Sequence, residues 1–231
     1  LIYLDSRSIR ADLSSGNREL LATLALEAST VLDNARLLEE QRDRQRMEEE
    51  LKIARTIQQS LLPRELPETG WFQAGGQSIP SYQVGGDYFD IRPIDLNAWA
   101  VVVADVSGKG VSSALLASLL QGVFLSAAAA PHEIEASIVR LNKFLLERTG
   151  GEKYATLFYG AFSQLGRLHY VNAGHCAPLL LSRSGEIREI PATGMPLGWF
   201  EEADYQSSTI ELMAGDRLVV FSDGVTEARN P

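Results

Sequence analysis

The longest uninterrupted pattern in the chain is helical and covers residues 17–62. The segment contains neither proline nor glycine, and helix-forming residues dominate it. Apolar residues recur every seven positions in its first half, at Leu24, Val31 and Leu38, as in a coiled coil. Polar residues from Glu39 to Arg46 interrupt this seam, which then resumes in a shifted phase. The pattern favours a helix that pairs with a second copy; packing of the apolar stripe on its own domain is the alternative.

Beyond Pro63 and Pro67, strand and helix patterns alternate, and we expect a domain boundary near these prolines. A short strand at 1–5 and a polar loop through Gly16 precede the long helix. Amphipathic or apolar spacing predicts helices at 111–129 and 132–148. Strands are predicted at 71–80, 87–93, 98–105, 155–162, 168–172, 179–182, 187–190 and 218–221. This order is not that of repeated βαβ units, and it predicts an α+β fold built as a layered sandwich.

Three acidic motifs lie beside the predicted strands. Asp87 follows two glycines at the start of one strand, Asp105 ends the strongly apolar strand 98–105, and Asp223 follows the last strand. Carboxylates gathered at neighbouring strand ends repel one another unless a cation lies between them. Hard oxygen ligands favour Mg²⁺ or Mn²⁺, and two such ions can clamp a phosphate for in-line attack by water. A single Asp-Gly is usually only a turn, but three motifs together favour a metal site.

Composition and charge exclude several classes of protein. The chain is 45% hydrophobic and 22% charged, which is typical of a soluble globular protein. Its net charge of −9 argues against a nucleic-acid-binding surface. The single cysteine, Cys176, excludes an internal disulfide and suits a reducing cytosol, so we predict a cytoplasmic protein. Residues 111–130 carry no charge and have the length of a membrane span, but their serines and glutamine favour a buried helix.

Other phosphate and metal motifs fail on spacing. Lys109 lies between two glycines, but the loop lacks the spacing and the Ser or Thr of a Walker A motif. His132, His169 and His175 have no helical metal-ligand spacing, which argues against zinc. His175 and Cys176 are adjacent, and neighbours on a strand point to opposite faces, so a thiol nucleophile paired with this histidine is not expected.

Five motifs in order resemble the bacterial metal-dependent protein phosphatases, in the sporulation and stress-response branch of the PPM family. They are LKIARTIQQSLLP at 51–63, VGGDYFD at 84–90, ADVSGKG at 104–110, NAGH at 172–175 and FSDGVTEA at 221–228. Residues 1–38 resemble the C-terminal end of a GAF sensor domain. The resemblance thus divides the chain into a GAF-like fragment at 1–38, a coiled-coil linker or switch at 39–66 and a phosphatase domain at 67–231.

The resemblance implies a β-sandwich flanked by helices, a pair of Mn²⁺ or Mg²⁺ ions, and hydrolysis of phosphoserine or phosphothreonine on a protein. By position, Asp105 would bridge the two metals and the backbone carbonyl of Val106 would bind one of them. Asp223 would bind the other metal, and Asp87 would be a further acidic ligand, direct or through water. These three aspartates are the expected catalytic residues.

Two further positions and one departure belong to the same comparison. Asp90 is a weaker candidate, with a structural role as the alternative. His175 has the residue type of a general acid, but the resemblance gives it no such role and a structural one is favoured. The family's catalytic domain continues past Pro231, and its final metal-binding aspartate lies there, so we expect the phosphatase domain to be C-terminally incomplete and this fragment to be weakly active or inactive.

The same branch implies a partner and a mode of control. Its usual substrate is a phosphorylated anti-sigma-factor antagonist, a small STAS-type protein, and the coiled coil would carry a signal from the sensor. We expect the switch at 51–62 and at the helix 111–121, driven by a change of register at the polar interruption 39–46. A catalytically inactive dimeric scaffold is the alternative function, and hydrolysis of a small phosphate ester is a third.

Overall fold

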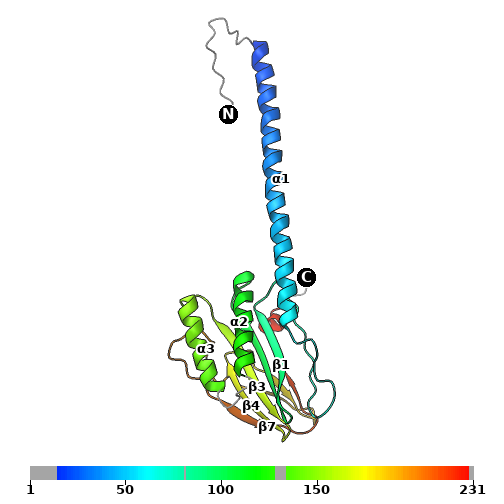
Figure 1. The fold of residues 1–231 in the computed structure, drawn as a ribbon, viewed down its shortest axis with the longest axis vertical. Coiled ribbons are helices and arrows are strands. Elements are labelled where there is room, and N and C mark those ends of the chain that lie inside the picture. Colours follow the sequence, from blue (N-terminus) through cyan, green and yellow to red (C-terminus); the bar gives the residue numbers. More distant parts are fainter. Residues whose placement is uncertain (1–14, 81, 128–133, 229–231) are drawn as a thin grey trace. The chain divides into compact units, whose positions relative to one another are not determined.

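The computed structural model describes residues 15–80, 82–127 and 134–228 (Figure 1). The chain divides into two compact units, residues 1–53 and 54–231. The predicted strand at 1–5 lies outside the described residues. The predicted long helix is confirmed as α1 (Ser15–Leu61), which begins two residues earlier than expected and therefore includes Gly16.

The part of α1 in the first unit displays its apolar seam. Leu24, Val31 and Leu38 are 50%, 66% and 56% exposed. Ion pairs one helical turn apart, such as Arg36 with Glu40 at 2.9 Å, add only a few tenths of a kcal/mol, roughly 0.3, to such a helix. Within the described residues of this unit, nothing covers the seam.

The second unit contains two antiparallel sheets. Five strands form the larger sheet in the order β1-β2-β3-β4-β7, and three form the smaller in the order β6-β5-β8. The larger sheet comprises β1 (Asp87–Asp95), β2 (Ala98–Val106), β3 (Ala155–Ser163), β4 (Arg167–Ala173) and β7 (Ser208–Glu211). The smaller sheet comprises β5 (Leu179–Leu181), β6 (Ile187–Glu189) and β8 (Arg217–Val219).

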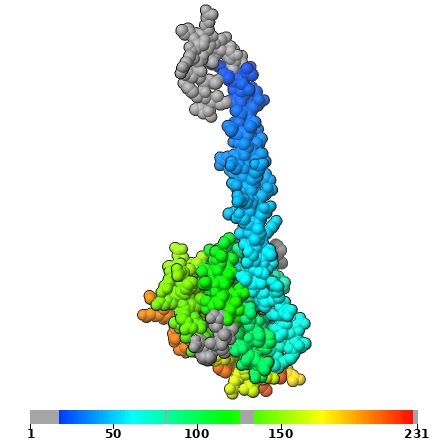
Figure 2. Space-filling view, viewed as in Figure 1, coloured from blue at the N-terminus to red at the C-terminus, as the bar shows by residue number. Residues whose placement is uncertain are grey.

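Helices α2 (Val111–Ala127) and α3 (Ile134–Thr149) lie side by side over one face of the larger sheet (Figure 1, Figure 2). Alternate residues of β2, among them Val102, Ala104 and Val106, are buried in the main core beneath these helices. Because strand side chains alternate between faces, the residues between them face the other side. The fold is therefore α+β, as predicted, and the described helices include none long and apolar enough to span a membrane.

The predicted strand at 71–80 is wrong. These residues form no ladder with any described strand. Phe72 instead stacks on Trp99 at 5.5 Å and packs on Phe162 at 5.1 Å. Ring contacts rather than sheet hydrogen bonds therefore hold this part of the segment 71–80. Two short elements were not predicted, the polar edge strand β7 and the helix α4 (Asp223–Thr226), because neither carries an apolar run.

Candidate functional site

The register of β1 and β2 brings two of the predicted aspartates together. Asp87 begins β1 and Asp105 lies one residue before the end of β2, and the antiparallel ladder makes them direct cross-strand partners. Such partners have Cβ atoms about 4.5–5.5 Å apart on the same face. Their side chains are within hydrogen-bonding reach of each other. Two carboxylates in contact need a shared proton or a cation.

Asp223 reaches the same place from the smaller sheet. It is the first residue of α4, a few residues after β8. Its neighbour Ser222 donates a hydrogen bond from Oγ to Oδ2 of Asp87 at 3.2 Å. The charge of Asp223 acts on both Asp87 and Asp105. The structure therefore pairs Asp87 with Asp105 directly and places Asp223 near enough to act on both through its charge.

The electrostatics of this cluster are unfavourable to three free carboxylates. Burial, followed by the charges of Asp87 and Asp223, raises the pKa of Asp105 to about 7. Burial also raises the pKa of Asp87, with the hydrogen bond from Ser222 acting in the opposite direction. Negative charge is therefore concentrated where the two sheets meet, and a cation there would relieve the repulsion.

Gly86 allows the backbone of Val106 to approach the carboxylates. A Cβ on Gly86 would lie 2.4 Å from the carbonyl oxygen of Val106 and 3.3 Å from Oδ1 of Asp105. Only glycine fits there. The Val106 N–H also donates to the carbonyl of Gly86 at 3.3 Å. The carbonyl predicted as a ligand thus lies beside the Asp105 carboxylate.

These donors fit a hard divalent cation, which takes carboxylate and carbonyl oxygens. Among the described residues, no three His, Cys, Asp or Glu side chains are close enough to one another to enclose an ion. The residues that could hold a metal are thus the Asp87–Asp105 pair with the Val106 carbonyl. Asp223 is near enough to act on this pair through its charge.

The loop after Asp105 is fixed by a residue that carried no sequence signal. Lys153 donates from Nζ to the carbonyl of Ser107 at 3.0 Å, and Ser113 donates to the same oxygen at 3.0 Å. Lys153 lies outside every motif, so only the pairing of β2 with β3 could reveal it. Lys109, in the loop itself, lies over the ring of Tyr82 at 5.4 Å.

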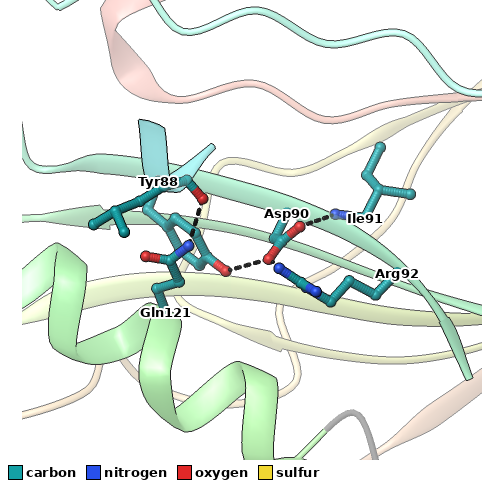
Figure 3. Close-up of polar contacts among 6 residues, drawn as sticks. Tyr88, Asp90, Ile91, Arg92 and Gln121 are labelled. Atoms are coloured by element: carbon teal, nitrogen blue, oxygen red, sulfur yellow. Dashed lines mark hydrogen bonds and ion pairs between the residues drawn. The ribbon is translucent and has the colours of Figure 1, made fainter. Parts of the chain in front are cut away.

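Asp90 belongs to a different environment (Figure 3). It is fully buried and accepts hydrogen bonds from the Tyr88 hydroxyl at 3.1 Å, the Ile91 N–H at 2.8 Å and Nε of Arg92 at 2.9 Å. Asp90 is three positions after Asp87, an odd spacing, so it lies on the opposite face of β1. These contacts favour a structural role for Asp90 over a role as a metal ligand.

His175 and Cys176 are not placed to do acid or nucleophile chemistry. His175 is buried, and its Nδ1 lies 2.9 Å from Oγ1 of Thr156. Burial lowers the pKa of His175 to about 4, with the charge of Asp223 acting in the opposite direction. The ring is therefore neutral at pH 7, and it lacks the imidazolium proton that a general acid would donate. Burial also raises the pKa of the Cys176 thiol, which keeps it protonated and unreactive.

Known proteins are similar to this chain in sequence and in fold. The chain is 29% identical over 187 residues to phosphoserine phosphatase RsbU of Bacillus subtilis, covering 80% of this chain and 56% of RsbU. It is 28% identical to the RsbU and RsbW domains of a Mycobacterium tuberculosis protein, with a TM-score of 0.55 over 64% of this chain and 41% of that one. The chain spans about half the length, or less, of the curated relatives it matches.

A more distant structure has the same fold. The SiaA-PP2C domain of Pseudomonas aeruginosa is 18% identical, with a TM-score of 0.61 over 78% of this chain and 73% of that one. The sequence profile of stage II sporulation protein E matches residues 95–231, which is more than half of the chain and includes Asp105 and Asp223. The chain therefore belongs to the stage II sporulation protein E (SpoIIE) family.

Proposed function

We propose that the chain is a metal-dependent protein phosphatase that hydrolyses phosphoserine or phosphothreonine on a regulatory protein. One observation carries the proposal: the cross-strand pairing of Asp87 with Asp105, with Asp223 beside them, in a member of the SpoIIE family. The relative RsbU is named a phosphoserine phosphatase. The paired carboxylates support the proposal, because such an activity needs acidic ligands for its metal ions.

The site would hold two ions, Mn²⁺ or Mg²⁺. Asp105 would be shared between them, the Val106 carbonyl would bind one ion and Asp223 the other, and Asp87 would be a further acidic ligand, direct or through water. Bound ions would supply the positive charge that offsets the carboxylates and polarises a phosphate ester. Ser222 orients Asp87 through its hydrogen bond, and Lys153 holds the Asp105 loop.

The partner that we propose is a phosphorylated STAS-type anti-sigma-factor antagonist, or a similar small phosphoprotein. We also propose that two chains pair through α1, since the seam residues Leu24, Val31 and Leu38 are half exposed or more, and an apolar seam of this spacing fits a second copy. Residues 1–38 would then be the end of a GAF sensor domain, 39–66 the linker, and 67–231 the phosphatase domain.

Contacts at the end of α1 support control of the site by this helix. Gln58 donates from Nε2 to the carbonyl of Gly85 at 2.7 Å and accepts from the Gly85 N–H at 3.1 Å. Gln121 of α2 donates to the carbonyl of Leu61. Because Gly85 lies two residues before Asp87, a rotation of α1 would move the turn that carries this carboxylate.

The test is release of phosphate, with Mn²⁺, from p-nitrophenyl phosphate and from a phosphoserine protein. It compares this chain, a chain extended at its C-terminus, and Asp105→Asn in both. We expect activity in the wild type that Asp105→Asn reduces by at least about a hundredfold, the size of losing one charge-stabilising group at a reacting phosphate. Asp95→Asn, which changes an exposed acid at the far end of β1, is the matched control and should keep full activity.

Calorimetric titration with Mn²⁺ gives a readout that does not depend on turnover. Wild type should bind Mn²⁺, and Asp105→Asn should not. Absence of both phosphate release and Mn²⁺ binding in the extended chain would refute the proposal. A dimeric scaffold that binds its partner without catalysis would then be the better account.

A further inference from the structure

Three aromatic rings form a continuous exposed stack at the end of the sheet that carries Asp105. Tyr154 stacks on Trp199 with centroids 5.1 Å apart and planes 13° apart. Trp199 in turn stacks on Phe200 at 5.7 Å and 25°. The three residues, here called the aromatic ladder, are 38%, 51% and 47% exposed. Large rigid rings in contact with water are typical of protein-binding surfaces rather than of a free surface.

Buried hydrogen bonds hold the ladder in place. Asn142 of α3 is buried, donates from Nδ2 to the carbonyl of Phe200 at 2.8 Å and accepts from the Gly198 N–H at 2.7 Å. One buried side-chain amide thus donates one hydrogen bond to the turn 198–200 and accepts another from it. These two bonds fix the turn, so the exposed rings are preorganised.

The ladder is continuous with the candidate active site. Tyr154 directly precedes β3, and its carbonyl accepts from the Ser107 N–H at 2.9 Å while its own N–H donates to Ser107 Oγ at 3.0 Å. Ser107 is two residues after Asp105. Tyr154 also lines the same broad depression as Asp87, Asp105 and Asp223. A protein seated on the ladder would therefore have its edge beside the carboxylates.

The rim of the ladder is acidic. Glu201, Glu202 and Asp204 are exposed and follow Phe200 directly in the chain, and with Phe200 they line a shallow hollow that also includes Met195. Acidic groups around an apolar centre match a partner whose apolar contact is ringed by Lys or Arg. They would also repel a partner whose only charge is its phosphate.

We propose that the aromatic ladder is the docking surface for the phosphoprotein substrate, which would present an apolar side chain flanked by basic residues. The inference rests on the proposed function and deepens it, because it assigns recognition of the protein to a surface separate from the carboxylates that act on the phosphate. A small phosphate ester would use the carboxylates alone, whereas a phosphoprotein would use both. The ladder would thus set KM for the protein substrate and leave the chemistry unchanged.

The test compares Trp199→Ala with wild type on two substrates, p-nitrophenyl phosphate and a phosphorylated STAS-type antagonist from the organism that encodes the chain. An anchor at the centre of an interface typically costs at least about thirtyfold in affinity when truncated. We expect KM for the phosphoprotein to rise by about that factor, with kcat unchanged and with p-nitrophenyl phosphate hydrolysis within about twofold of wild type. Leu96→Ala, which removes an exposed apolar side chain in the β1–β2 turn, should change neither substrate.

Reversing the charge of the rim tests the chemistry of the partner. The double variant Glu201→Lys, Glu202→Lys should raise KM for the phosphoprotein several-fold and weaken its dependence on salt. Calorimetric binding of the phosphoprotein in EDTA, where no turnover occurs, measures docking even if catalysis fails.

Each contrary outcome has a distinct meaning. Equal loss on both substrates would show that Trp199 supports the active site itself, and no change on either would show that the ladder is not a docking surface. Wild-type binding in EDTA without any hydrolysis would refute the proposed function and leave the ladder standing. A drop in molar mass by light scattering in Trp199→Ala would assign the ladder to contact between copies of this chain and overturn the inference.

Discussion

Removing the buried carboxylate of Asp90 should destabilise the second unit strongly without touching the acidic cluster. Asp90 is fully buried and accepts three hydrogen bonds, from Tyr88, Ile91 and Arg92. In Asp90→Ala the Tyr88 hydroxyl, itself almost fully buried, and the Ile91 N–H would both lose a charged acceptor. An unsatisfied buried donor costs free energy that no solvent contact offsets.

The magnitude follows from these partners. A hydrogen bond to a charged group contributes about 1.5–3 kcal/mol, so the buried Tyr88 hydroxyl and the N–H of the half-buried Ile91 account for most of the effect. The Arg92 side chain is 45% exposed, and water can replace its partner, so its share is small. We expect the free energy of unfolding to fall by about 3–5 kcal/mol, as for one partner removed from a buried ion pair.

Urea unfolding followed by tryptophan fluorescence provides the measurement. The three tryptophans, Trp71, Trp99 and Trp199, all lie in the second unit, so the signal reports on the sheets. Asp95→Ala is the matched control, because Asp95 is exposed on the same strand and accepts a single hydrogen bond from Asn97 at 2.7 Å. It should cost no more than about 1 kcal/mol.

Two results would refute this reasoning about Asp90. A loss below about 1 kcal/mol would mean that the network contributes little. Unchanged stability with loss of Mn²⁺ binding would mean that Asp90 is a ligand after all.

Three further predictions concern the site. In EDTA, Asp105→Asn should raise the free energy of unfolding by about 2 kcal/mol at pH 8 and by under about 1 kcal/mol at pH 5. The raised pKa of Asp105, about 7 against 3.8, makes its ionisation unfavourable in the folded state as pH rises, and both magnitudes are halved because the side chain is partly exposed. Equal gains at both pH values in urea unfolding would contradict this. Burial lowers the pKa of His175 from 6.5 to about 4, so the unfolded chain takes up a proton at this residue first, and lowering the pH from 7 to 5 should reduce the free energy of unfolding by about 2 kcal/mol. His175→Gln should remove that part of the pH dependence, and an unaltered pH profile in this variant would contradict the prediction. Gly86→Ala should destabilise the protein by at least about 1 kcal/mol and weaken Mn²⁺ binding, because the new Cβ would strike the Val106 carbonyl. The control is Gly122→Ala, in α2 with open space around it, which should stabilise the protein by about 0.5–1 kcal/mol. Thermal melts and Mn²⁺ titration of both variants test the two expectations.

Local pattern was enough to predict most elements, and it placed Asp105 at the end of the strand that pairs with Asp87. The helix at 17–62, the strand ending in Asp105 and the amphipathic helix at 132–148 follow from periodicity, which depends only on neighbours in the chain. The same reasoning failed at 71–80, where apolar residues are spaced as in a strand but bind through ring contacts with Trp99 and Phe162. A segment is a strand only if another strand pairs with it, and sequence spacing does not contain the partner.

The sequence by itself determined that acidic residues end apolar strands, and through the motifs at 51–63, 84–90 and 104–110 it determined the family that the chain resembles. Only the tertiary structure decided that Asp87 and Asp105 are cross-strand partners, that Asp90 lies on the other face, and that Lys153 holds the Asp105 loop. It also decided that Trp199 stacks on Tyr154, 45 positions away in the chain. These contacts depend on strand register and on loops folded back over the sheet, and long-range pairing is fixed by the packing of the whole core rather than by any local run of residues.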